Sequence, residues 1–311
     1  MCDIFFDVCY DTFRLAAKSW GDSSAKPMLL YPGWLDNAGS FDSIAPVLAD
    51  RGYYVIALDP PGCGKSDHLP KICTINDYDE PPLILDVADI LGWTTFTLAG
   101  HSRGGGVVSA VAGAWPDRVT ALVIFDSAMG LSMGFPYEAP LAKTMASYRL
   151  RADRSQKRKP RKFASVEEAV MRNYHHPMFR KHYTTAKNIT KRHLRPCKDG
   201  SGFEFTHDTR TYGQSSRMYV SSNDSLELLR RIKCPVILIR AADGFGSQPS
   251  EKHYLDKYIK PRISAISNLT VELVQGGHHV HSDEPWIVGR KVADFLDKCS
   301  LDSTDQIPSK L

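Results

Sequence analysis

The stretch LAGHSRGGGVV, residues 98–108, places a single serine among four glycines, directly after a short apolar run. Within it, Gly100-His101-Ser102-Arg103-Gly104 matches the pattern G-x-S-x-G, in which a sharp turn between a strand and a helix presents a nucleophilic serine. Glycine at both ends of the pattern is expected where a side chain would crowd the neighbouring strand or helix. The spacings of phosphate-binding loops, G-x-x-x-x-G-K-[ST] and G-x-G-x-x-G, do not occur in this stretch. We therefore predict that Ser102 is a nucleophile.

The sequence around this stretch alternates between short apolar runs and segments of helical length. Short apolar runs that end in Pro/Gly turns are typical of buried parallel strands, and their alternation with helices predicts a sheet covered on both faces. The opening residues 1–10 are interpreted as a first strand or an irregular lead-in. The predicted strands are 26–31, 53–58, 96–99, 119–125, 235–239 and 269–274, and the predicted helices are 41–50, 82–91, 104–115 and 286–296. The predicted fold class is therefore α/β, with a mostly parallel, doubly wound sheet.

The alternation stops after residue 130 and resumes near residue 234, which divides the chain into parts. We expect residues 1–130 and 234–299 to form the core, residues 131–233 to form a mainly helical cap insertion, and residues 300–311 to form a flexible polar tail. Residues 143–198 contain seventeen Lys and Arg but three acidic residues, a local net charge of +14 within a chain whose net charge is +4. Such charge runs are usually solvated, although this one could also hold an anionic part of a substrate.

A serine hydroxyl is a poor nucleophile until a base takes its proton, so the prediction for Ser102 requires a histidine. The segment VQGGHHVHSDEPW, residues 274–286, follows a predicted strand and contains three histidines. Gly277-His278, followed by Pro285, has the form of a catalytic histidine turn, and His278 is the predicted base. His279 and His281 are interpreted as neighbours that fill or polarise the loop. A metal site in this cluster is the weaker alternative, because no second ligand cluster at a recognised spacing accompanies it.

The base needs a carboxylate that orients it, and two aspartates at predicted strand ends qualify. Asp243 follows the strand 235–239, and the chain order Ser, Asp, His is the one found in enzymes with a G-x-S-x-G nucleophile turn. Asp126, at the end of the strand 119–125, is the alternative acid. We predict Asp243, since an aspartate at a strand end is also a common structural cap and that role fits Asp126 better.

Two backbone N–H groups are needed to stabilise the negative oxygen that forms during acyl transfer. The predicted donors are Arg103, directly after Ser102, and Trp34, in the turn PGWLDNAGSFD that follows the strand 26–31. The side chain of Arg103 has two interpretations. It favours an anionic substrate or lowers the pKa of the base by repulsion, or it points away into an ordinary salt bridge.

The motifs YPGWLDNAGSFD, LDPPGCGKSD, GHSRGG and GGHHVHSDEP together resemble the α/β-hydrolase superfamily. Within it, LAAKSWG, GWLDNAGSFD and HHVHSDEP are similar to the serine hydrolase-like proteins and the insect kraken-type hydrolases. The resemblance covers about residues 12–130 and 234–298. It implies an α/β-hydrolase fold, a triad of Ser102, Asp243 and His278, and oxyanion donors at Trp34 and Arg103. Pro32 stands where relatives commonly have histidine, and Arg103 stands where a less charged residue is usual.

The expected activity is that of a serine hydrolase that cleaves a carboxylic ester or thioester of a lipid-like acyl substrate without a cofactor or a metal. The alternatives are a non-catalytic binding protein, which Pro32 and Arg103 favour, and a C–C bond hydrolase or acyltransferase that uses the same triad. A small-molecule acyl substrate is therefore the expected partner. No nucleic acid is expected, because the basic segment lacks aromatic or motif-like support. No membrane span is expected either, because no apolar run approaches the roughly 18 to 20 residues required.

The chain ends in Ser309-Lys310-Leu311, and S-K-L at a C-terminus is a peroxisomal address. The polar stretch that precedes it would leave it accessible to the import receptor. We expect the protein to reside in the peroxisome, with a cytoplasmic location as the alternative.

Overall fold

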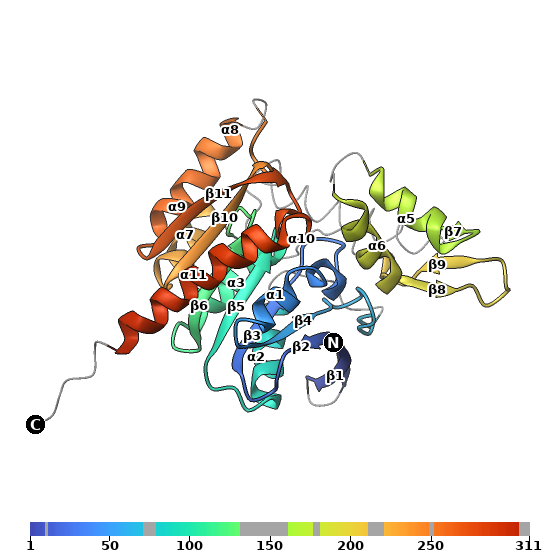
Figure 1. Cartoon of the computed structure of the whole chain (residues 1–311), viewed down its shortest axis with the longest axis horizontal. Coiled ribbons are helices and arrows are strands. Elements are labelled where there is room, and N and C mark those ends of the chain that lie inside the picture. The colour runs from blue at the N-terminus through green and yellow to red at the C-terminus, as the bar shows by residue number, and fades with distance from the viewer. Residues whose placement is uncertain are drawn as a thin grey trace, which may run out of the picture.

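The computed structural model describes residues 1–9, 12–70, 79–130, 161–176, 181–210, 221–248 and 252–304. Its centre is an eight-stranded sheet with the order β1-β2-β4-β3-β5-β6-β10-β11 (Figure 1). From β4 to β11 neighbouring strands are parallel, whereas β1 and β2 pair antiparallel at one edge. The strands are β1 Cys2–Val8, β2 Phe13–Trp20, β3 Lys26–Tyr31, β4 Tyr53–Leu58, β5 Phe96–His101, β6 Val119–Phe125, β10 Val236–Asp243 and β11 Leu269–Gly277. The prediction of a mostly parallel α/β sheet is confirmed.

Helices cover both faces of this sheet, because successive strand residues point to opposite sides. In β3, Leu29 faces the layer that contains α2, α3, α7 and α9, whereas Met28 and Leu30 face the layer that contains α1 and α11. The helices of the first layer are α2 Glu80–Ile90, α3 Arg103–Ala114, α7 Ser222–Arg230 and α9 Lys260–Ala265; those of the second are α1 Ala45–Ala49 and α11 Pro285–Thr304. The short turns η1 Ala38–Phe41, α8 Lys252–Tyr254, η4 Leu255–Ile259 and α10 Val280–Asp283 connect them.

Two elements differ from the sequence-based expectation for identifiable reasons. Strand β2 was not predicted; it is largely buried although it contains Lys18, whose ammonium pairs with Asp42. The expected helix 41–50 is divided into η1 and the shorter α1. Pro46 lies in the first turn of α1, a position that suits proline because the first N–H groups of a helix have no intrahelical partner.

The described part of the expected cap contains α5 Val166–Tyr174, α6 Tyr183–Arg192 and a small antiparallel sheet. That sheet has the order β7-β9-β8, with β7 Lys162–Phe163, β8 Leu194–Pro196 and β9 Phe203–Phe205. No pattern in the sequence predicted these short strands. Helix α6 lies against η1 and α10, beside the edge at which the parallel strands end (Figure 1). Farther along, Leu229 and Ile232 pack with the core around α3.

The C-terminal helix is longer than predicted. Helix α11 continues to Thr304, so the first residues of the expected flexible tail, 300–304, are helical. The segment Ser309-Lys310-Leu311 lies outside the described residues. Among the helices that the structure describes, none combines the length and the apolar character needed to cross a membrane.

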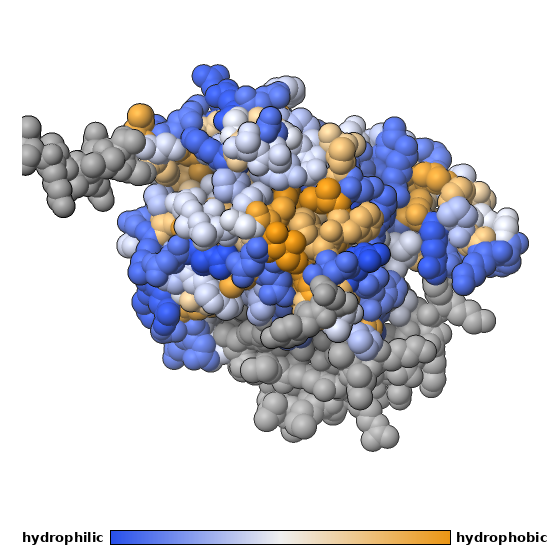
Figure 2. Space-filling view, turned by 90° about the horizontal axis from the view of Figure 1, so that it is seen from below, coloured by the Kyte–Doolittle hydropathy of each residue, from blue (hydrophilic) through white to orange (hydrophobic). Residues whose placement is uncertain are grey.

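The face seen from below carries a central patch of apolar side chains with hydrophilic ones around it (Figure 2). Apolar atoms contribute roughly 55–60% of the surface of an ordinary folded protein. The patch by itself therefore does not mark a functional site.

Candidate active site

Ser102 occupies a tight turn between β5 and α3, with a backbone φ of 52° and ψ of −120°. A non-glycine residue in this region stores about 1–3 kcal/mol of backbone strain, which the surrounding structure must hold. The turn is closely packed: a Cβ on Gly100 would lie 2.6 Å from the Gly104 carbonyl oxygen, and a Cβ on Gly104 would lie 2.4 Å from the carbonyl oxygens of Tyr31 and Pro32. Both glycines of G-x-S-x-G are thus required by close approach, as the sequence predicted.

A continuous chain of hydrogen bonds connects Ser102, His278 and Asp126. The Ser102 Oγ lies 2.8 Å from His278 Nε2, and His278 Nδ1 lies 2.6 Å from an oxygen of Asp126. The Asp126 carboxylate also accepts hydrogen bonds from the backbone N–H groups of Ala241 and Phe245, at 3.1 and 2.8 Å. An ionised carboxylate can only accept a hydrogen bond, so Nδ1 carries the imidazole proton and the lone pair of Nε2 faces the serine hydroxyl.

The structure places Asp126, the alternative acid, in the contact with His278 that we predicted for Asp243. Both residues lie where neighbouring parallel strands end, but the N–H of Asp126 donates to the carbonyl oxygen of Ile239, four residues before Asp243 on β10. Asp243 extends farther along β10, at a register shift opposite Gly277, and is exposed. The exposed side chain of Asp243 contrasts with the buried carboxylate of Asp126, which contacts His278 Nδ1.

The predicted oxyanion loop lies directly against Ser102. A Cβ on Gly33 would be 3.2 Å from the Ser102 Cβ, which places the turn after β3 beside the nucleophile. The Asp36 N–H donates to the Gly33 carbonyl oxygen at 3.2 Å and closes a β-turn with Trp34 and Leu35 at its centre. Leu35 has a φ of 61°, a conformation that costs a residue with a side chain about 1–2 kcal/mol.

Arg103 begins helix α3, so its backbone belongs to the helix N-terminus that adjoins Ser102. Its guanidinium group lies 2.5 Å from the Glu80 carboxylate, and the two side chains are 10% and 2% exposed. Of the two interpretations of this side chain, the structure supports the salt bridge. The positive charge beside the nucleophile is therefore balanced within the protein.

A buried polar cluster lies beside His278 and contains Asp36, Ser40, His101, His279 and His281. His279 Nε2 donates to Asp36 at 3.0 Å, His101 Nε2 donates to the His278 carbonyl oxygen at 2.8 Å, and Ser40 Oγ lies 3.0 Å from His281 Nε2. The cluster thus contains a neighbour of Ser102, a neighbour of His278 and a residue of the oxyanion loop. It joins the three loops that meet at the site.

Burial sets the protonation of this cluster. It lowers the pKa of His101, lowers that of His279 to about 3, and lowers that of His281 well below its usual range. Burial alone would raise the pKa of Asp36, but His279, hydrogen bonds from its neighbours and Lys181 lower it well below the usual range. Neutral imidazoles therefore surround an ionised carboxylate.

Side-chain ligand atoms of Asp36, His101 and His279 lie within 4.8 Å of one another, which is close enough for all three to contact one metal ion. The two Nε2 atoms already donate hydrogen bonds, to the His278 carbonyl and to Asp36 respectively. Those bonds, and the contact of His281 Nε2 with the Ser40 hydroxyl, fit the interpretation of His279 and His281 as neighbours that fill or polarise the loop.

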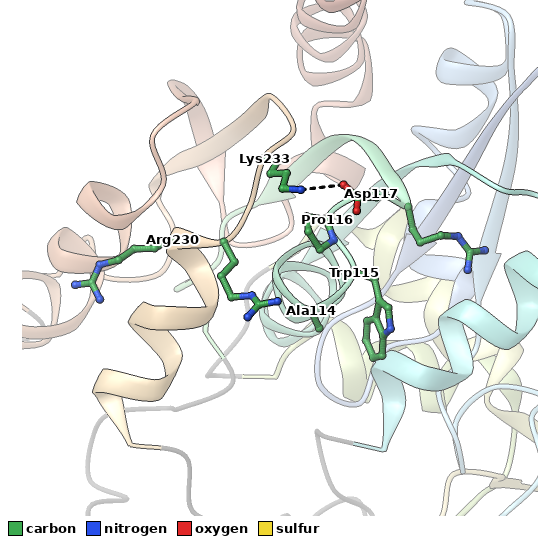
Figure 3. Close-up of a pocket in the computed structure, with 8 residues that line it drawn as sticks. Ala114, Trp115, Pro116, Asp117, Arg230 and Lys233 are labelled. Carbon is green, nitrogen blue, oxygen red and sulfur yellow. Dashed lines mark hydrogen bonds and ion pairs between the residues drawn. The ribbon is translucent and has the colours of Figure 1, made fainter.

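A surface hollow of about 590 Å³ lies elsewhere, lined by residues 114–118, Arg230, Arg231 and Lys233 (Figure 3). It adjoins the C-terminal end of α3, whereas Ser102 precedes the N-terminal end, and a helix of this length spans roughly 18 Å. Several of its cations have partners: Lys233 pairs with Asp117 at 3.0 Å, and the Arg231 Nε donates to the Gly113 carbonyl oxygen at 3.1 Å. The hollow is therefore separate from the site built around Ser102.

Sequence reasoning did not identify Asp36, Glu80 and His193 as neighbours of the site. Asp36 lies within the quoted stretch GWLDNAGSFD, but nothing in its spacing links it to the histidine turn, 243 residues away. Glu80 and His193 lie in segments without a recognisable motif.

Comparison with known proteins agrees with the architecture. Residues 26–285 match the family model described as alpha/beta hydrolase fold. A serine hydrolase-like protein of Dictyostelium discoideum is 30% identical over 91% of this chain and 78% of its own length. A serine hydrolase-like protein of Danio rerio is 29% identical over 94% of this chain and 88% of its own length.

Solved structures show the same likeness. A hypothetical protein from Pseudomonas aeruginosa PAO1 superposes with a TM-score of 0.81 and 26% identity, covering 97% of this chain and 99% of that one. The thioesterase domain from the curacin biosynthetic pathway, with a TM-score of 0.79 and 18% identity, covers 94% and 99% and shows the fold alone. The chain therefore belongs to the α/β-hydrolase fold family.

Proposed function

We propose that the protein is a serine hydrolase that cleaves a carboxylic ester or thioester through Ser102, His278 and Asp126. The observation that carries the proposal is the hydrogen-bonded chain from the serine hydroxyl through both imidazole nitrogens to a buried carboxylate. Each contact has the length that proton transfer between a nucleophile and its base requires. The names of the serine hydrolase-like relatives point to the same class of reaction.

The geometry fits a two-stage acyl transfer. His278 Nε2 takes the hydroxyl proton while the Ser102 oxygen attacks the acyl carbonyl carbon, and Asp126 stabilises the imidazolium that forms. The same imidazolium then protonates the departing alcohol or thiol, which leaves an acyl group on Ser102. Water, deprotonated by His278, attacks this acyl-enzyme, releases the carboxylic acid and restores the serine.

The negative oxygen of each tetrahedral intermediate needs donors that are already in place. We assign the backbone N–H groups of Trp34 and Arg103 to this role. The support is that Gly33 lies against Ser102 and that Arg103 begins a helix, whose N-terminus favours negative charge. Loss of one such donor typically removes about 2.7–4 kcal/mol of transition-state stabilisation.

The binding-protein alternative depended on two unusual residues, Arg103 and Pro32. The Arg103 charge is paired with Glu80, and Pro32 is buried with its carbonyl oxygen against Gly104. Neither feature therefore counts against catalysis. We propose a lipid-like acyl ester or thioester as the substrate, as expected from the sequence.

Labelling with a fluorophosphonate tests the proposal. The folded wild type should be labelled at Ser102, as identified by peptide mass, and Ser102→Ala should not be labelled. The control Ser24→Ala removes an exposed serine that is distant from Ser102 in the sequence, and it should label like the wild type. A folded wild type that resists the reagent would contradict the proposal. A panel of esters and thioesters of increasing chain length, with product identification, then defines the acyl group and separates hydrolysis from acyl transfer.

A further inference from the structure

His193 connects the cap to the loop that holds the predicted oxyanion donor. It is the residue at the C-terminal end of α6 and is buried, at 3% exposed. Its Nδ1 accepts a hydrogen bond from the backbone N–H of Gly64 at 3.1 Å. On the other side of the ring, its Nε2 lies 3.1 Å from the Leu35 carbonyl oxygen. One imidazole therefore bridges the loops that follow β4 and β3.

The two contacts determine which nitrogen carries the proton. A backbone N–H can only donate, so Nδ1 must offer its lone pair to Gly64, and the proton of the neutral ring lies on Nε2. Nε2 then donates to Leu35. Burial lowers the pKa of His193, which agrees with a neutral ring.

The surroundings hold the ring in place. The neighbouring Arg192 donates from Nε to both oxygens of buried Asp59, at 2.8 and 2.9 Å. The His193 carbonyl oxygen accepts from the N–H and the hydroxyl of Thr206, at 2.6 and 3.0 Å. The end of α6 is thus anchored to the core on one side and to the rest of the cap on the other.

The carbonyl that His193 contacts belongs to the strained residue of the oxyanion turn. Leu35 has a left-handed φ, and Trp34, the assigned donor, directly precedes it. We propose that His193 is a positioning residue: by donating to the Leu35 carbonyl it keeps the turn in the conformation that aims the Trp34 N–H at the substrate oxygen. This inference rests on the proposed serine hydrolase function. It makes the oxyanion site depend on a residue of the cap, 158 residues away in sequence.

Two conservative substitutions separate the two hydrogen bonds of the ring. The amide nitrogen of H193Q can take the place of Nε2 and donate to Leu35, whereas the amide oxygen of H193N can take the place of Nδ1 and accept from Gly64. A residue that only attached the cap would tolerate both changes alike. A residue that positions the oxyanion turn needs the donor that H193Q retains.

The experiment compares fluorophosphonate labelling rates, ester kcat and KM, and thermal unfolding for the wild type, H193Q and H193N. Since loss of a whole oxyanion donor lowers kcat by about 10²–10³-fold, we expect H193N to lose roughly tenfold or more in kcat and labelling rate with KM nearly unchanged. H193Q should stay close to the wild type. The control H182N changes an exposed histidine at the start of the same helix and should leave the labelling rate, kcat and KM unchanged.

The outcomes are distinguishable. The role of His193 is refuted, while the proposed function stands, if the wild type labels at Ser102 and H193N labels equally fast. The same conclusion follows if the labelling rates of H193Q and H193N fall by the same factor. If the folded wild type does not label at all, both are refuted.

Discussion

The carboxylate of Asp126 lies 2.6 Å from Nδ1 of His278, although 152 residues separate the two in the chain. Asp126 follows β6 and His278 follows β11, and β10 lies between these two strands in the sheet. The ends of parallel strands meet at one edge, where α/β proteins commonly build their sites. This contact supports Asp126, rather than Asp243, as the residue that orients the proposed base His278.

Replacement of each aspartate by asparagine tests that assignment. Asp126→Asn should lower the rate of ester hydrolysis by on the order of 10³–10⁴-fold, because an amide no longer fixes the tautomer or stabilises the imidazolium. Asp243→Asn should leave the rate nearly unchanged, since Asp243 is exposed. Steady-state kinetics on one ester gives both values, and thermal unfolding verifies that each variant is folded. A severe loss in Asp243→Asn alone would restore the acid predicted from the sequence.

The strained backbone of Ser102 predicts that removing the nucleophile can stabilise the protein. Glycine adopts a φ of 52° without steric strain, whereas alanine has the same Cβ as serine. Ser102→Gly should therefore be more stable than Ser102→Ala by about 1 kcal/mol, after allowance for the greater flexibility of unfolded glycine. Urea unfolding of the two inactive variants measures the difference. Equal stability would mean that the fold does not strain this turn.

The buried pair of Arg103 and Glu80 should be costly to break from either side. Glu80→Gln leaves a guanidinium with reduced compensation inside the protein, and we expect a loss of about 3–5 kcal/mol in the free energy of unfolding. Arg103→Met should lower the free energy of unfolding by a similar amount. The double variant should lose less than the sum of the two, by about 1–3 kcal/mol, because the two charges are removed together. Strict additivity in denaturant unfolding would show that the two charges are not coupled.

The buried histidines predict that stability falls as the pH is lowered from 6.5 toward 4. Burial lowers the pKa of His279 from 6.5, its value in the unfolded chain, to about 3 in the folded protein. Between these two values the unfolded chain binds a proton that the folded protein does not. Each such group contributes a slope of about 1.4 kcal/mol per pH unit to the free energy of unfolding. His101, His193 and His281 are shifted in the same direction.

His279→Gln isolates the contribution of one ring. The glutamine amide can still donate to Asp36 but does not titrate. Denaturant unfolding at several pH values between 4 and 7 should therefore give a shallower decline for this variant than for the wild type. Parallel curves would contradict the assignment of His279 as a neutral buried group that becomes protonated on unfolding.

Much of the fold could be predicted from the sequence, because strands buried on both faces appear as continuous apolar runs between Pro/Gly turns. The boundaries of β3, β4 and β6 agree with their predicted ranges. Strand β2 was missed because Lys18 interrupts its apolar pattern, and only its pairing with Asp42 makes its burial possible. The short strands of the cap lacked a pattern because two or three residues are too few to show a period of two.

The sequence by itself determined the nucleophile turn and the histidine turn as candidates, since a local conformation such as that of Ser102 requires particular residues at fixed spacings. Gly100 and Gly104, four residues apart in the chain, are needed because a strand and a helix approach each other closely at this turn. Only the tertiary structure decided what those residues contact. The choice of Asp126 over Asp243, the pairing of Arg103 with Glu80 and the bridge from His193 to Leu35 depend on strand register and cap docking, which bring together atoms that no spacing along the chain relates.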